Sequence, residues 1–215
     1  DHDKIKPALK SMYLTKTIDR LNKLKDDKHF SKFFTSPIYI NNEKYKSLNE
    51  VEDILKQVIP KKLYDVDQFN IIHGDLCFAN IMIDNNYNFV KIIDPRGKFG
   101  DFDIYGDPRY ELAKLFHSVD GKYDFIIKDL FDINYDLENT TINYHINDSV
   151  RDFNLYKLFT DVFDDEIGDD LPKIELIEAL LFLSMIPLHG ENIKHQLTML
   201  GTGLNILNRT VDITA

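Results

Sequence analysis

The chain has 215 residues, 43% of them hydrophobic, which is enough for one good-sized core, and its single cysteine, Cys77, excludes an intrachain disulfide framework. The net charge of −10 comes from residues 71–215, since residues 1–70 carry a slight basic excess. An acidic region of this size disfavours nucleic acid as a partner because it would repel phosphates. It is compatible with a cationic substrate or a metal, although a solubilising acidic surface is the commoner reason for such a charge.

No segment of the sequence is suited to a membrane. The longest apolar run, residues 179–188, is about half of what a bilayer-spanning helix needs. The charged start of the chain lacks the apolar region of a signal peptide, and the absence of an initiator methionine is compatible with a start inside a longer protein. We therefore expect a cytoplasmic protein with neither a membrane nor a nucleic-acid partner.

The first sixty residues predict two helices and one hairpin. Apolar residues recur at helical spacing over residues 5–25, and "SPIYINNEKYKSL" reads as a short β-hairpin that turns at Asn41-Asn42. Ser47 and Glu50 form a capping-box pattern, and the helix that follows is expected to end at Pro60.

The rest of the chain predicts a small β insert followed by helices. Strands are expected at "FNII" (69–72) and "IMI" (81–83), on either side of a polar loop, and at "FVKIID" (89–94). Asp107-Pro108 is typical of a helix start, and the pattern beyond it is helical, with further helices at 149–164, 172–186 and 191–208. These elements predict a single α+β domain over residues 1–215, mostly helical, in which the β insert carries the polar motifs.

The polar loop "HGDLCFAN", residues 73–80, has the residue types that phosphoryl transfer needs. Asp75 stands five residues before Asn80, and Asp94 ends the next strand fourteen residues later. A carboxylate such as Asp75 orients an acceptor hydroxyl and takes its proton. An amide oxygen and a second carboxylate, here Asn80 and Asp94, are hard oxygen ligands of the kind that Mg²⁺ prefers.

At these residues the sequence resembles a known superfamily. "HGDLCFAN" is similar to the H-x-D-x-x-x-x-N catalytic loop of kinases, in the form with Gly after His that occurs in the aminoglycoside phosphotransferase and choline kinase superfamily. "IIDPRG" (92–97) resembles its metal-binding strand end, and "GDPRYELAKL" (106–115) resembles its following helix. The resemblance covers roughly residues 71–118, and the helical flanks look like the C-terminal lobe of such proteins. The sequence pattern "DPRG…GDPRY" is similar to that of bacterial members linked to capsule and surface-polysaccharide biosynthesis.

The resemblance implies roles at the matching positions. Asp75 would be the catalytic base, Asn80 and Asp94 would bind Mg²⁺, His73 would support the loop backbone, and Asp107 would brace the site from the start of the next helix.

The roles of two arginines remain open at this stage. Arg96 and Arg109 either meet a phosphate or an anionic substrate, or pair with nearby acids such as Asp101, Asp103 or Glu111. Two departures stand out. Asp94-Pro95-Arg96-Gly97 replaces the Asp-Phe-Gly of protein kinases, and Glu111 stands where the superfamily has Asp. Cys77 is expected to be a packed thiol rather than a nucleophile.

The distribution of glycine bears on how ATP would be held. All nine glycines lie at or after Gly74, whereas a loop that covers ATP phosphates with backbone amides normally needs glycine. Before the polar loop, the sequence predicts only one β-hairpin. We therefore expect that the chain is a C-terminal lobe alone, that an N-terminal ATP-gripping lobe lies upstream as its partner, and that the ATP-binding residues are outside this sequence.

The resulting prediction is an ATP- and Mg²⁺-dependent phosphotransferase that acts on a small-molecule hydroxyl in the intact parent protein. The acceptor could be a sugar, an amino alcohol or an aminoglycoside, and the 215-residue chain by itself would turn over little. Two alternatives remain: a non-catalytic kinase-like module that keeps the loop for folding, and a self-sufficient enzyme with an abbreviated lobe made from residues 1–60.

Overall fold

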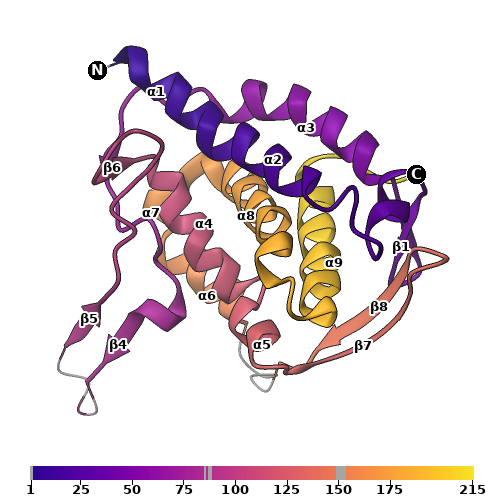
Figure 1. The fold of residues 1–215 in the computed structure, drawn as a ribbon. Coiled ribbons are helices and arrows are strands. Elements are labelled where there is room, and N and C mark those ends of the chain that lie inside the picture. The colour runs from indigo at the N-terminus through magenta and orange to yellow at the C-terminus, as the bar shows by residue number, and fades with distance from the viewer. Residues whose placement is uncertain (1, 85, 87–88, 149–153) are drawn as a thin grey trace.

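The computed structural model describes residues 2–84, 86, 89–148 and 154–215, and it has an α+β fold (Figure 1). Helices make up 55% and strands 15%, so the predicted class, α+β and mostly helical, is confirmed. The described helical elements are α1 His2–Leu9, η1 Lys10–Thr15, α2 Lys16–Asn22, η2 Ser31–Phe34, α3 Leu48–Leu63, η3 Phe78–Asn80, α4 Pro108–Val119, α5 Tyr123–Ile127, α6 Leu155–Val162, α7 Asp164–Ile167, η4 Gly168–Asp170, α8 Leu171–Met185, η5 Ile186–His189 and α9 Ile193–Thr210.

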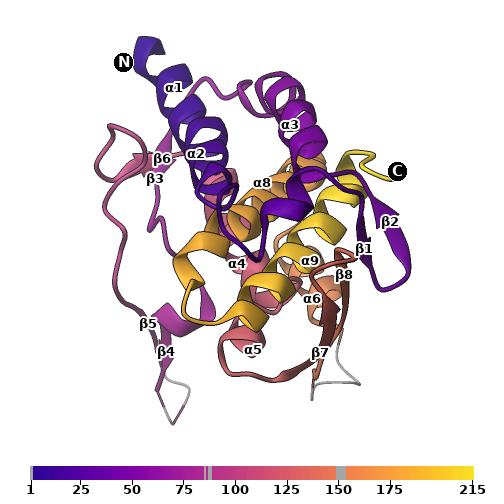
Figure 2. The same ribbon diagram turned by 45° about the vertical axis from the view of Figure 1, so that its right-hand side comes forward.

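Helix α8 forms the centre of the fold. Its residues 174–184 are all buried, because α2, α4 and α9 pack around it (Figures 1 and 2). A helix that is apolar on every side is stable in water only inside a core. The apolar residues of α8 therefore belong to the core. Buried residues from both ends of the chain join the same hydrophobic cluster.

The N-terminal helices surround this centre. Helices α1 and α2 are joined by η1, a six-residue π-helical segment that carries the buried Tyr13. The capping box of α3 is present, with Ser47 and Glu50 bonded as predicted. The predicted end of that helix at Pro60 is wrong, because α3 continues to Leu63. Proline lacks only its own N–H, so a helix near its last turn can continue past it at the loss of one hydrogen bond.

A four-stranded sheet with the order β2-β1-β8-β7 covers one side of the helices. Its strands are β1 Ile38–Ile40, β2 Glu43–Tyr45, β7 Phe131–Asp136 and β8 Thr141–Ile146. The predicted hairpin is confirmed, since β1 and β2 pair antiparallel and both Asn41 and Asn42 have positive φ. Strand β8 joins β1 in parallel.

The β7–β8 hairpin corrects the expectation that everything after Asp107 is helical. Burial along β7 alternates from residue to residue, as it does in a strand with one covered face. Asp136 accepts hydrogen bonds from the backbone N–H groups of Glu138 and Asn139, and Thr140 has a positive φ, so polar residues build the turn. The alternation at 131–136 was the available signal for this hairpin.

Two small antiparallel pairs hold the polar loop on the other side of the helical core (Figures 1 and 2). They are β3 Asn70–Ile71 with β6 Tyr105–Gly106, and β4 Ile81–Ile83 with β5 Val90–Ile92. The three strands predicted around the loop are therefore present. Asp107 caps α4 and Pro108 occupies its first turn, as predicted.

The C-terminal helices agree with the sequence prediction where they are described. The predicted helices at 172–186 and 191–208 correspond to α8 and α9, and the described part of 149–164 contains α6 and the start of α7. Residues 149–153 of that prediction lie outside the described residues. Among the described residues, no helix combines the length and the hydropathy required to cross a bilayer.

Candidate active site

The backbone of the polar loop is held by one side chain of α4. The Glu111 carboxylate accepts hydrogen bonds from His73 N at 2.9 Å and from Gly74 N at 2.6 Å, one on each oxygen. Two half-buried amides that would otherwise lack partners are satisfied by one charged group, and hydrogen bonds to a charged acceptor are the stronger kind. Glu111 therefore anchors the loop to the helix.

The ring of His73 links the loop at Asp75 to the strand end before Asp94. Its Nδ1 accepts a hydrogen bond from Asp75 N at 3.3 Å, and its Nε2 lies 2.8 Å from the Ile93 carbonyl oxygen. Because Nδ1 accepts, the proton belongs on Nε2, which donates to the carbonyl. His73 thus lies inside the loop and fixes its backbone, which is the position implied by the resemblance.

Asp75 and Asn80 are brought together by the turn of η3. Asn80 Nδ2 donates to the Asp75 carbonyl oxygen at 2.8 Å and to its Oδ2 at 3.3 Å. The other carboxylate oxygen, Oδ1, is 2.8 Å from the Nζ of Lys114, whose side chain is 9% exposed. Since the amide nitrogen of Asn80 faces Asp75, its amide oxygen faces away and is available to a further ligand.

Asp94 is placed beside these residues because Ile93 and Arg96, which flank it in the chain, are hydrogen-bonded to the loop. Ile93 N donates to the Asn80 carbonyl oxygen at 3.0 Å, and Arg96 N donates to the His73 carbonyl oxygen at 2.8 Å. Asp94 itself is exposed and has a left-handed φ of 55°, a conformation that Asp adopts more readily than most residues. No described residue bonds its carboxylate, which leaves both oxygens accessible.

The Asn80 amide oxygen and the Asp94 carboxylate are the atoms expected to bind Mg²⁺. Among the described residues, no three His, Cys, Asp or Glu side chains are grouped closely enough to hold a metal by themselves. Mg²⁺ in a phosphotransfer site requires less, because it binds through one or two protein oxygens and takes its other ligands from water and substrate phosphates. The Asn80 amide oxygen and the Asp94 carboxylate fit that smaller requirement.

Asp107 and Arg109 form a buried network at the start of α4. Asp107 accepts hydrogen bonds from Tyr13 Oη at 2.8 Å and from Arg109 Nη2 at 2.8 Å. The guanidinium of Arg109 also donates to Asp65 Oδ1 at 2.8 Å and to the Leu63 carbonyl oxygen at 3.0 Å. Both side chains are buried. Arg109 is therefore committed to holding α4 against η1 and the end of α3.

Arg96, by contrast, lies at the surface of the loop. Its aliphatic stem packs on Gly74, where a Cβ would lie 3.0 Å from the Arg96 Cβ. Its Nη1 donates to Tyr110 Oη at 2.8 Å, and no described residue forms an ion pair with it. The two arginines that the sequence could not distinguish thus have different environments, one enclosed and one exposed.

Cys77 is buried on the inner side of the loop, and burial raises the pKa of its thiol. A protonated, enclosed thiol is a poor nucleophile, in agreement with the packed role expected for it. The next residue is tied to α4, because Phe78 N donates to Ser118 Oγ at 3.2 Å.

Sequence reasoning missed the stripe of α4 that faces the loop. Tyr110, Lys114 and Ser118 are spaced four residues apart, so they lie on one side of the helix and contact Arg96, Asp75 and Phe78 in turn. Polar residues at helical spacing in the helix that follows the polar loop were the signal that could have identified them.

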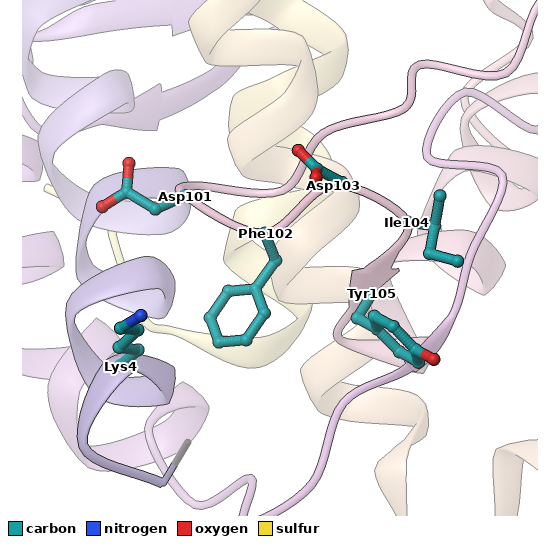
Figure 3. Close-up of a pocket in the computed structure, with 6 residues that line it drawn as sticks. All are labelled: Lys4, Asp101, Phe102, Asp103, Ile104 and Tyr105. Carbon is teal, nitrogen blue, oxygen red and sulfur yellow. The ribbon is translucent and has the colours of Figure 1, made fainter.

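A separate pocket lies elsewhere on the molecule. It is lined by Lys4 of α1 and by residues 101–105, and Figure 3 shows the Phe102 ring between Lys4 and the Tyr105 side chain. None of the predicted site residues lines this pocket. The candidate active site is therefore the loop and its α4 support, and the pocket is distinct from it.

Comparison of the chain with protein-family models, with curated proteins and with solved structures gave no match. A function for the site is therefore inferred from the residues of this chain.

Proposed function

We propose that the chain carries the catalytic loop of an ATP- and Mg²⁺-dependent phosphotransferase that acts on a small-molecule hydroxyl. The observation that supports this most is the arrangement of Asp75, which is bonded to Asn80 on one oxygen while His73 and Glu111 fix the backbone beside it. A carboxylate held in this way is positioned before a substrate arrives, as catalysis by proximity requires.

In the proposed reaction the acceptor oxygen attacks the γ-phosphorus of ATP. The new P–O bond forms as the bond to the bridging oxygen breaks, ADP leaves, and the hydroxyl proton passes to Asp75. Mg²⁺, held through Asn80 and Asp94, would neutralise charge on the phosphate oxygens. His73 and Glu111 act on the loop rather than on the substrate, so they are positioning residues.

The ATP-gripping lobe remains part of the proposal, and the β4–β5 hairpin offers a surface for it. Met82, Ile83, Val90 and Ile92 expose apolar side chains there. The hairpin follows η3 directly, so this surface adjoins the loop. Grouped exposed apolar side chains mark interaction sites, and we propose that the nucleotide base and the missing lobe cover them. The alternative of an abbreviated lobe in residues 1–60 is less favoured, because α1–α3 pack into the same core as α8 and β1 joins the sheet of β7 and β8.

The direct test is ADP release from MgATP by the native protein over a panel of hydroxyl acceptors. Asp75→Asn should lower kcat by about 10²–10⁴-fold, the usual contribution of a general base. Asp101→Asn is the matched control, because Asp101 is an exposed acid outside the loop, and it should leave the rate unchanged. An unchanged rate in Asp75→Asn would refute the assigned role.

A non-catalytic kinase-like module is the second candidate. The ion pair of Asp75 with the buried Lys114 favours it, since that contact occupies one of the two carboxylate oxygens. This candidate predicts MgATP binding without ADP release for every acceptor.

A further inference from the structure

Four basic side chains lie near Tyr110, and one of them, Lys114, contacts Asp75. Arg96 donates to the Tyr110 hydroxyl, and the Nζ of Lys16 lies 5.4 Å from the centre of the Tyr110 ring. Arg20 and Lys114 are close enough for their charges to act on both Tyr110 and Lys16. We call these residues the cation cluster; its members are Lys16, Arg20, Arg96 and Lys114.

Among the described residues, Lys114 is the one member of the cation cluster that forms an ion pair with an acid. Asp75 pairs with Lys114, but Arg20 donates to the Ser184 carbonyl oxygen at 3.1 Å and Arg96 to a neutral phenol. Lys16 has no acidic partner among the described residues. Burial and then the charges of Arg96, Arg20 and Lys114 lower the pKa of Lys16 to about 7. Like charges held together in this way are unfavourable unless an anion joins them.

One member of the cluster contacts Asp75 directly. Lys114 contacts Oδ1, whereas Asn80, a proposed Mg²⁺ ligand, contacts Oδ2. The donor phosphates would accompany the metal ion on the Asn80 side. An acceptor whose hydroxyl approaches Oδ1 would therefore meet the cluster through Lys114.

We propose that the cation cluster binds a multiply charged oxyanion carried by the acceptor, so that the substrate is an anionic small molecule such as a phosphorylated sugar or polyol. Two guanidinium groups and two ammonium groups match the many acceptor atoms of a phosphate. The inference that the oxyanion belongs to an acceptor rests on the proposed phosphotransferase function. The existence of an oxyanion site rests on the cluster itself.

The first experiment measures the binding of inorganic phosphate to the intact protein by calorimetry. Lys16→Met and Arg96→Met should each weaken binding by at least about tenfold, because each removes a charged donor. Lys61→Met is the matched control, an exposed lysine of α3 outside the cluster, and it should bind phosphate as the wild type does. Equal affinity in Lys16→Met and Lys61→Met, or no saturable binding by the wild type, would overturn the proposal.

A second readout does not depend on the stability of the variants. In the wild-type protein, phosphate should move the titration midpoint of Lys16, followed by NMR at its ε-carbon, to higher pH, because a bound anion favours the charged amine. A midpoint that phosphate leaves unchanged would mean that the anion does not bind at the cluster.

The effect of Mg²⁺ on phosphate affinity decides whether the bound oxyanion belongs to the acceptor or to the nucleotide. Phosphate affinity that is the same with and without Mg²⁺, and the same in Asp94→Asn, supports an acceptor site. Affinity that requires both Mg²⁺ and Asp94 would assign the cluster to the nucleotide phosphates and overturn the acceptor assignment. If instead Asp75→Asn leaves ADP release unchanged while Lys16→Met still weakens phosphate binding, the proposed function fails and the oxyanion site stands.

Discussion

Removal of the Glu111 carboxylate tests how the loop is held. Glu111→Ala leaves the backbone N–H groups of His73 and Gly74 without their acceptor, and both are at least partly buried. A buried amide that loses its partner costs about 1–3 kcal/mol. The two amides together predict a loss of about 2–6 kcal/mol in the free energy of unfolding, toward the lower value where water reaches the loop.

The structure also predicts where the loss occurs. The exchange of the His73 and Gly74 amide hydrogens should accelerate strongly, because the loop opens without global unfolding. Glu111→Gln keeps one acceptor oxygen and should have an intermediate effect on stability and exchange. Denaturant unfolding gives the free energies, and hydrogen exchange followed by NMR gives the local effect.

The matched control for this experiment is Asp53→Ala. Asp53 is an exposed helical acid, with 73% of its side chain accessible, and it forms only a surface ion pair with Lys56. Its removal should change stability by less than about 0.5 kcal/mol. If Glu111→Ala matches this control in stability, and the exchange of the two loop amides is unaltered, then the carboxylate does not anchor the loop.

Three further predictions follow from other contacts. Burial raises the pKa of Glu178 well above 4.5, so the folded carboxyl keeps a proton that the unfolded one loses, and stability falls as pH rises above about 4.5. Glu178→Gln should therefore gain free energy of unfolding relative to the wild type between pH 4.5 and 7.5 in urea titrations, and a constant difference would contradict this. Gly74→Ala should lower the free energy of unfolding by about 1–2 kcal/mol from the left-handed backbone alone, and further because the new Cβ clashes with Arg96. Gly97→Ala is the control, because Gly97 has a similar φ but open space around it, so only the backbone loss is expected. Equal losses for the two variants in denaturant unfolding would exclude the clash. Arg109→Lys should lose about 3–5 kcal/mol by the same assay, because one ammonium cannot replace the donors to Asp107, Asp65 and Leu63, and a loss below about 1 kcal/mol would refute the network.

The sequence predicted those elements whose signals are local. The capping box at Ser47, the turn at Asn41-Asn42 and the cap at Asp107 each involve residues within a few positions of one another, so their chemistry decides the backbone directly. The central helix was also predictable, because a long apolar run bounded by Pro172 must be buried.

The missed elements differ in how much the sequence showed of them. The strand that ends at Asp136 alternates between apolar and polar residues and was readable, but the pairing of its hairpin with β1, about one hundred residues earlier in the chain, was not. Pairing between such distant segments has no signature in a single sequence. The same reason applies to the site. The acids and the amide of the loop were readable as a motif, but Lys16 and Lys114 come from helices whose approach to Asp75 depends on how the whole core packs.

The proposed oxyanion site also bears on how net charge is read. The acidic surface of this chain is compatible with a cationic ligand, yet Asp75 forms an ion pair with the buried Lys114, and Arg96 donates to Tyr110 on the same helix. Charges separated by more than about 8–10 Å in water are largely screened, whereas half-buried charges a few ångströms apart are not. A ligand bound at the cation cluster would therefore experience the charges of that cluster much more strongly than the negative charge of the distant surface. On this reasoning, phosphate should bind to a protein whose net charge would repel it, and raising the salt concentration should weaken that binding less than it weakens the adsorption of cations to the acidic surface.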